Sequence, residues 1–168
     1  MPLIMSWSEC SVEIGKTGVA DAMAATLVSV GVIEDKSTTM QTAAGEKLIK
    51  KKSGGKIVAM AETEGEITIT TKVVEPDFAF LATLIPATND ATAEELKVTS
   101  QLIEDNYSVK VTPKNIGGTG VRARKTRVSY QDGYDEANGH FATLTFTIIE
   151  CADNELYTKF KKKAPVAP

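Results

Sequence analysis

Residues 56–85 constrain the fold of this chain more than any other stretch. Residues 57–61 and 67–73 alternate between two faces with a period of two, and they are rich in Ile, Val and Thr. This pattern is typical of half-buried strands. Residues 63–65, which end in Gly65, predict a tight turn between the two strands. We therefore expect an antiparallel hairpin from this stretch.

The hydrophobic period changes directly after that hairpin. Asp77, preceded by Pro76, stands where a helix N-cap is expected, and Pro86 ends the pattern. Between them, apolar residues recur at three- and four-residue spacing: Phe78, Leu81, Ala82 and Ile85. The sequence therefore predicts a short amphipathic helix that covers one face of a sheet.

The end of the chain follows a similar plan. Residues 139–150 alternate as a strand and Asp153 is a second candidate N-cap. The apolar residues of a second short helix would be Leu156, Tyr157 and Phe160. The likeness of the two stretches is explained either by an internal pseudo-repeat or by chance, because strands that lead into capped helices are common.

A projecting basic arm is predicted at about residues 36–56. Residues 38–42 and 47–52 favour strands, with turns at 43–45 and 53–55. Four lysines of the arm are candidate contact residues: Lys47, Lys50, Lys51 and Lys52. These lysines either contact a partner or a polyanion, or they protect the edge of a solvated hairpin from unwanted pairing.

A second basic cluster lies in the strand predicted at residues 121–130. Its candidate contact residues are Arg122, Arg124 and Arg127. Basic side chains on both faces of the pleat indicate an edge strand or a strand at a subunit boundary. After this strand, Asp132-Gly133 predicts a hairpin turn. Earlier in the chain, residues 87–95 predict a loop.

These patterns predict a mainly β fold with some helix, an antiparallel β-sandwich or half-barrel with one or two short flanking helices. The chain has 168 residues, which is most simply a single domain spanning residues 1–168. The basic and proline-rich residues 161–168 are expected to form a mobile tail.

Composition limits the function classes. The chain is 42% hydrophobic and 24% charged, as expected for an ordinary soluble protein. No apolar run approaches the roughly 18–20 residues that a membrane span needs, and no leader is recognised. The cytoplasm of the producing cell is therefore the expected compartment. The net charge of −3 argues against a dedicated nucleic-acid binder.

Candidate catalytic and metal-ligating residues are few. His140 is the single histidine, and no nucleophile motif accompanies it. Cys10 and Cys151, far apart in sequence, do not make a zinc pattern and are expected to be reduced thiols. The GKTG at residues 15–18 lacks the earlier glycine of a phosphate-binding loop, because Cys10 stands in its place. We expect no enzyme activity, cofactor or metal site.

The order of these features resembles the tail tube (major tail) proteins of tailed bacteriophages. The similar segments are GGKIVAMAETEGEITITTKVVEPDFAFLATL and GHFATLTFTIIECADNELYTKF, within about residues 28–85 and 121–160. The resemblance implies a twisted β-sandwich or half-barrel, and hexameric rings that stack into a hollow tube through which DNA passes without specific binding. Related tubes occur in contractile injection machines and type VI secretion.

The resemblance also implies partners and a location. The chain would bind copies of itself and, at the ends or outside of the tube, sheath, tape-measure, terminator or baseplate proteins. It would lie in the virion tail, assembled in the host cytoplasm. In this family a long hairpin reaches a neighbouring subunit or ring, and residues 36–56 match that hairpin. We expect the arginine cluster at a subunit contact, opposite the acidic residues Asp132, Asp135 and Glu136 of a neighbour.

Two other functions remain open. One is another β-sandwich component of a virion, such as a tail-completion, baseplate or head-fibre protein. The other is a nucleic-acid-binding module that uses the lysines of the arm and the arginine cluster.

Overall fold

Antiparallel strands make up most of the structure, a computed structural model that describes residues 3–165. The predicted fold class is confirmed, because the strands form an antiparallel half-barrel with one short flanking α-helix. The elements in chain order are β1 (Cys10–Lys16), the 3₁₀ turn η1 (Val19–Asp21), β2 (Val28–Ser29), β3 (Thr39–Thr42), β4 (Lys47–Lys51), β5 (Ile57–Glu62), β6 (Ile67–Val74), α1 (Phe78–Leu84), β7 (Ala87–Asp90), β8 (Glu95–Val98), β9 (Asn106–Pro113), β10 (Thr119–Asp135), β11 (Gly139–Ile148) and β12 (Thr158–Lys161).

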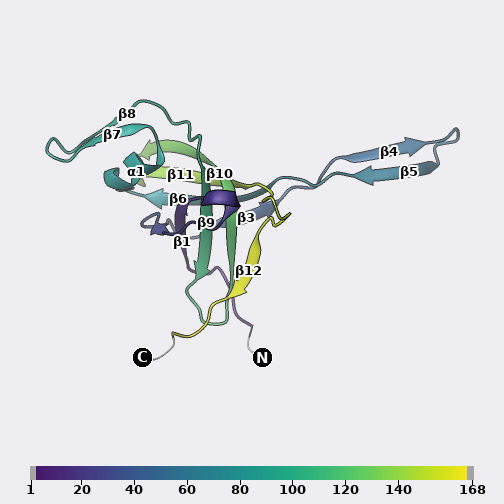
Figure 1. Ribbon diagram of the computed structural model, residues 1–168, viewed down its shortest axis with the longest axis horizontal. Helices are drawn as coiled ribbons and strands as arrows, with labels where there is room; N and C mark the ends of the chain where they lie inside the picture. The colour runs from purple at the N-terminus through teal and green to yellow at the C-terminus, as the bar shows by residue number, and fades with distance from the viewer. Residues whose placement is uncertain (1–2, 166–168) are drawn as a thin grey trace.

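The main sheet has the strand order β2-β1-β9-β10-β11-β6-β3, and β12 pairs with β10. Two further pairs, β4–β5 and β7–β8, form separate two-stranded ribbons. Figure 1 shows that these two ribbons project from opposite ends of the molecule, along its longest axis.

The segment that carries β2 and β3 connects the two edges of the main sheet. It begins as β2 beside β1, where Val30 N donates a hydrogen bond to Val12 O at 3.0 Å. It then crosses to β6, where Ile33 bridges Val73, and it continues as β3 along the same strand. Gly31 lies at the crossing with φ +108°, a conformation that L side chains rarely adopt. The sheet is thereby curved into the half-barrel.

Alternating side chains of the strands fill the interior of the half-barrel. The strand residues buried at 0% exposure include Val12, Ile69, Val73, Val109, Val111, Leu144 and Phe146. Helix α1 adds Leu81 and Leu84 to the same core. Asp77 accepts a hydrogen bond from Ala79 N at 3.3 Å, which confirms the predicted N-cap. Burial of each large apolar side chain stabilises the fold by about 1.5–3 kcal/mol.

The hairpin predicted around residues 63–65 is wrong. Strand β5 pairs with β4, whereas β6 pairs with β3 and β11. Neither residues 63–65 nor residues 43–45 reverse the chain. They are the two places where one long hairpin passes from its base, β3–β6, to its outer part, β4–β5. The turn of this hairpin lies at residues 53–55, as predicted, where Gly55 N donates to Lys52 O.

The second predicted helix is also wrong. Asp153 accepts a hydrogen bond from Glu155 N at 3.3 Å, as an N-cap would, but Asn154 has φ +64° and the chain does not continue into a helix. It extends instead as β12 along the first residues of β10, whose backbone groups β11 does not reach. Phe160 covers Gly120 there, since a Cβ on that glycine would lie 2.4 Å from the ring. The likeness between the two stretches therefore does not extend beyond the strand.

Two predicted loops are strands. Asp132-Gly133 does not turn, because β10 continues to Asp135 and the turn falls at residues 136–138. Gly133 instead pairs with Phe141, and a Cβ at Gly133 would lie 2.4 Å from the phenyl ring. Residues 87–95 form most of the β7–β8 ribbon. Gly15 and Lys16 of the GKTG stretch lie in β1.

The predicted tail is only partly described. Lys161 ends β12, and Lys162 N donates to Gly118 O at 2.9 Å. This start of the segment therefore lies against the loop before β10. Residues 166–168 lie outside the described residues.

Candidate assembly site

The outer part of the long hairpin has no core of its own. We call residues 46–63, which carry β4 and β5, the arm; residues 36–42 of the predicted arm belong to the body instead. Every residue of β4 and β5 is exposed. The large apolar side chains exposed there are Leu48, Ile49, Ile57, Val58 and Met60. Large exposed apolar side chains clustered on one element make it a candidate interaction site.

The register of the ribbon distributes these side chains over both of its faces. Leu48 pairs with Ala61, and Ile49 pairs with Met60 on the opposite face of the pleat. Leu48 is 61% exposed and Met60 is 60% exposed. Since neither face packs on the body, the arm presents apolar surface in two directions.

Two glycines separate the arm from the body. A Cβ at Gly45 would lie 1.4 Å from Thr63 O, and a Cβ at Gly65 would lie 2.0 Å from Ala43 O. No side chain fits at either position, so the two strands cross with their main chains in direct contact. We call this crossing the waist. Ala43 N donates to Glu66 O at 2.8 Å on the body side of the waist.

The lysines of the arm form no ion pair in the part of the chain that the structure describes, although Lys47 stands opposite Glu62 in the ribbon. Among residues 3–165, no ion pair involves Lys47, Lys50, Lys51 or Lys52. All four side chains are exposed. The structure therefore places these four predicted contact residues together on the projecting ribbon, where they are available to a partner.

The arginine cluster is divided among different environments. Arg124 pairs with Asp153 and Glu155, with a distance of 3.1 Å to Glu155 Oε2. The hydrogen bond to Asp153 raises the pKa of Arg124 and lowers the pKa of the Asp153 carboxyl. Arg127 donates to Glu104 O. Arg122 is exposed and has no ion pair among the described residues.

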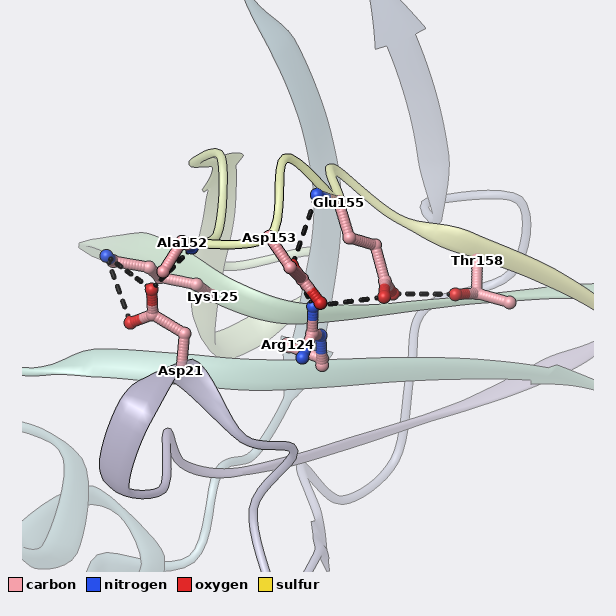
Figure 2. A network of polar contacts seen from close by, with 7 residues as sticks. All are labelled: Asp21, Arg124, Lys125, Ala152, Asp153, Glu155 and Thr158. Carbon is pink, nitrogen blue, oxygen red and sulfur yellow. Dashed lines mark hydrogen bonds and ion pairs between the residues drawn. The ribbon is translucent and has the colours of Figure 1, made fainter.

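Figure 2 shows that Arg124 belongs to a network that ties the connection after β11 to β10. Lys125 Nζ lies 3.0 Å from Asp21 Oδ1, and Asp21 Oδ2 accepts from Ala152 N at 3.0 Å. The hydrogen bond from Lys125, followed by that from Ala152 N, lowers the pKa of Asp21. This network holds residues 149–157 in place and so positions β12. It gives Arg124 a structural role within its own chain.

The acidic residues expected to face the arginines also have partners within the chain. Asp132 lies 2.7 Å from His140 Nε2, and the imidazole stacks on Tyr134 with ring centroids 4.4 Å apart. Asp135 accepts from Asn138 N and Nδ2, and the side-chain hydrogen bond lowers the pKa of this carboxyl. Glu136 is exposed in the turn. Part of the arginine cluster and part of the acidic cluster therefore already have polar partners within the same chain.

Other candidate sites are weaker. Among residues 3–165, no group of three or more His, Cys, Asp or Glu side chains is placed to hold a metal ion. A groove of about 460 Å³ lies between the end of α1 and residues 100–107, lined by no His or Cys. Cys10 and Cys151 are free thiols. Among the described residues, no helix has the length and apolar character needed to cross a bilayer.

Sequence reasoning missed the waist of this site and the second projecting ribbon, β7–β8. The waist glycines were interpreted as turn residues, although their wide separation along the chain, at positions 45 and 65, is compatible with two facing strands. The β7–β8 ribbon was interpreted as a loop because Thr, Ala and Asn hide its alternation.

Comparison with known proteins gives no matching family model and no curated protein with significant similarity.

Proposed function

We propose that this chain is a structural subunit of a phage tail tube, which polymerises as stacked rings of identical copies in the virion. The arm is the observation that carries this proposal. A two-stranded ribbon alone in water is marginally stable at best. The arm exposes apolar residues on both faces, so its stable environment is a surface supplied by another molecule. In a polymer of identical copies, the next subunit supplies that surface.

Open sheet edges support the same conclusion. Strand β3 forms one end of the main sheet, and β12 pairs on one side only, with β10. Unpaired edges are available for strands of a second copy, and a closed ring removes them. A subunit of this kind is completed by assembly rather than by its own fold.

The outer face of the sheet suits the wall of a channel for DNA. Thr39, Thr70, Thr145 and Ser129 form one continuous row across β3, β6, β11 and β10. Lys72 on this face is paired with Glu34 at 3.0 Å. Tight binding of DNA depends on free cations that neutralise its phosphates, so this row of hydroxyls lets DNA pass. Arg127 lies beside the row, two residues from Ser129 on the same face of β10.

Electron microscopy of the concentrated protein tests the proposal. We expect rings or tubes from the full chain. The matched variant replaces residues 43–66 by Asn-Gly, which joins Thr42 to its β6 partner Ile67 through a two-residue hairpin turn. This variant should keep a cooperative unfolding transition, because no arm residue is buried, and it should remain monomeric. A full chain that stays monomeric at all salt and protein concentrations would contradict the proposal.

A nucleic-acid-binding module is the second candidate. The observation that favours it is the arm sequence from residue 47 to residue 61, which has five lysines and no acidic residue. In this case, affinity for DNA should fall steeply with salt, with a slope of about −0.9 for each phosphate neutralised. Binding of that kind by a chain that forms no rings would favour this candidate over the tube.

A further inference from the structure

Charge is separated along the molecule. Residues 47–61 of the arm contain five lysines and no Asp or Glu, whereas residues 73–96 contain five acidic residues and no Lys, Arg or His. We call residues 73–96, which carry α1, β7 and the first residues of β8, the acidic end. Figure 1 shows the arm and the β7–β8 ribbon at opposite ends of the longest axis. One subunit is therefore basic at one end and acidic at the other.

The β7–β8 ribbon of the acidic end is largely exposed, whereas α1 buries Leu81 and Leu84 in the core. The β7–β8 ribbon pairs only with itself, and Glu94 and Glu95 are exposed at its turn. Asp90 shapes this turn, because its Oδ1 accepts from Thr92 N at 3.0 Å and from Ala93 N at 3.1 Å. Apolar side chains lie among these charges, with Phe78 37% exposed and Val98, next to the acidic end, 41% exposed.

In the described part of the chain, neither set of charges is paired with side chains of opposite charge. Among the described residues, no ion pair involves a lysine of the arm or a carboxylate of the acidic end. The two ends project away from each other, so they cannot meet within one subunit (Figure 1). Any contact between them would therefore have to join two copies.

We infer that the arm of one copy docks on the acidic end of the next copy, an inference that rests on the self-assembly proposed above. The two surfaces differ and lie on opposite ends, so the contact is head-to-tail. Repeated contacts of this type give a ring when the rotation closes and a filament when it does not. The lysines and carboxylates steer and orient the two surfaces, and the apolar side chains of both supply contact area.

Charge reversal in pairs tests the docking. The variant K50E/K51E reverses the arm, E94K/E95K reverses the acidic end, and a fourfold variant carries all of these changes. All four side chains are exposed, so each chain should fold, as far-ultraviolet circular dichroism will verify. In sedimentation velocity at low salt, each double variant should need a concentration higher by roughly tenfold or more to assemble. The fourfold variant should return to near the wild-type concentration.

A control separates docking from a general effect of net charge. The variant K114E/K163E changes two exposed lysines outside the arm, the acidic end and the open edge strands, and alters the net charge as much as K50E/K51E does. It should assemble like the wild type. If the wild type assembles but the fourfold variant does not regain assembly, the acidic end is not the receiving surface, although self-assembly stands. If the wild type never assembles, the proposed function itself fails.

Cross-linking gives a measurement that does not depend on charge. Ser53→Cys lies at the tip of the arm and Thr92→Cys lies at the turn of the β7–β8 ribbon. Oxidation of an equimolar mixture should give disulfide-linked dimers that neither variant gives alone. Absence of mixed dimers under assembling conditions would overturn the docking. Loss of DNA binding in K50E/K51E with unchanged assembly would instead assign the lysines to a polyanion.

Discussion

Strands β5 and β6 follow each other in the chain and have similar alternating sequences, but their surroundings differ completely. In β6, Ile69, Thr71 and Val73 are fully buried, whereas every residue of β5 is exposed. Strand β6 has neighbours on both sides and a core below it, while β5 has only β4. Apolar alternation thus indicates that a strand needs a covered face. It does not say whether the same chain or another copy covers it.

The largest expected effect concerns the body. Phe146 has 0% exposure in the centre of the core. Phe146→Ala should lower the free energy of unfolding of the subunit by about 3–5 kcal/mol, because it leaves a cavity that the half-barrel cannot fill. Urea denaturation of dilute protein measures this change. Thr145→Ala, on the opposite face of the same strand, is the control and should cost far less.

The next largest effect is expected at the waist, the boundary between the arm and the body. Gly45→Ala places a methyl group 1.4 Å from Thr63 O, so the two strands must move apart at the waist. We expect the opening free energy of the arm amides to fall by about 1–3 kcal/mol, as for other overpacked sites. Hydrogen exchange measures it residue by residue. Unchanged protection in the arm, or equal loss of protection in the core, would show that the waist is not the boundary.

Ala44→Ser provides the control for the waist. Ala44 is exposed beside Gly45, so the added hydroxyl has room. Its arm amides should exchange like those of the wild type.

Acid stability should depend on the network that anchors β12. The folded-state pKa of Asp21 is lowered, so its contribution to stability is present above the unfolded value of about 3.9 and is lost as pH falls through the folded value. Asp21→Asn removes this contribution. The urea midpoint of the wild type should therefore fall more steeply below about pH 4 than that of the variant. Parallel pH profiles would show that Lys125 and Ala152 N do not stabilise the carboxylate.

The smallest expected effect is on the arm of the isolated subunit. Met60 is 60% exposed, so Met60→Ala should change the unfolding free energy of the dilute protein by less than about 0.5 kcal/mol. The same change should weaken assembly measured by sedimentation. A large loss of subunit stability would mean that the arm packs on its own body in solution.

Much of the body could be predicted from the sequence. Alternation indicated β6 and β11, and the Pro76-Asp77 start with its apolar spacing indicated α1. Strand pairing could not be predicted in the same way, because the pattern of one strand does not identify its neighbour. The role of a glycine could not be predicted from the local sequence either. Gly45, Gly65 and Gly133 suit turns, but here they allow a main-chain crossing and a phenyl ring.

The candidate site could be predicted only in part, because some of its contacts form only when distant segments meet. The lysines of the arm stand out in the sequence as a run without acids. The partners of Arg124 do not, because Asp153 and Glu155 reach it only after the chain folds back along β10. The ion pairs of Arg124 depend on tertiary structure, which the local pattern of charge in the sequence does not reveal.

The crossing at Gly45 and Gly65 also bears on how such a protein can diversify. Contacts there run from main chain to main chain, so their geometry is independent of the residues beyond them. A ribbon of another length or composition could be grafted outward of the two glycines while the half-barrel folds as before. If the arm is the attachment surface, as proposed, a lineage could change its neighbour without rebuilding its core.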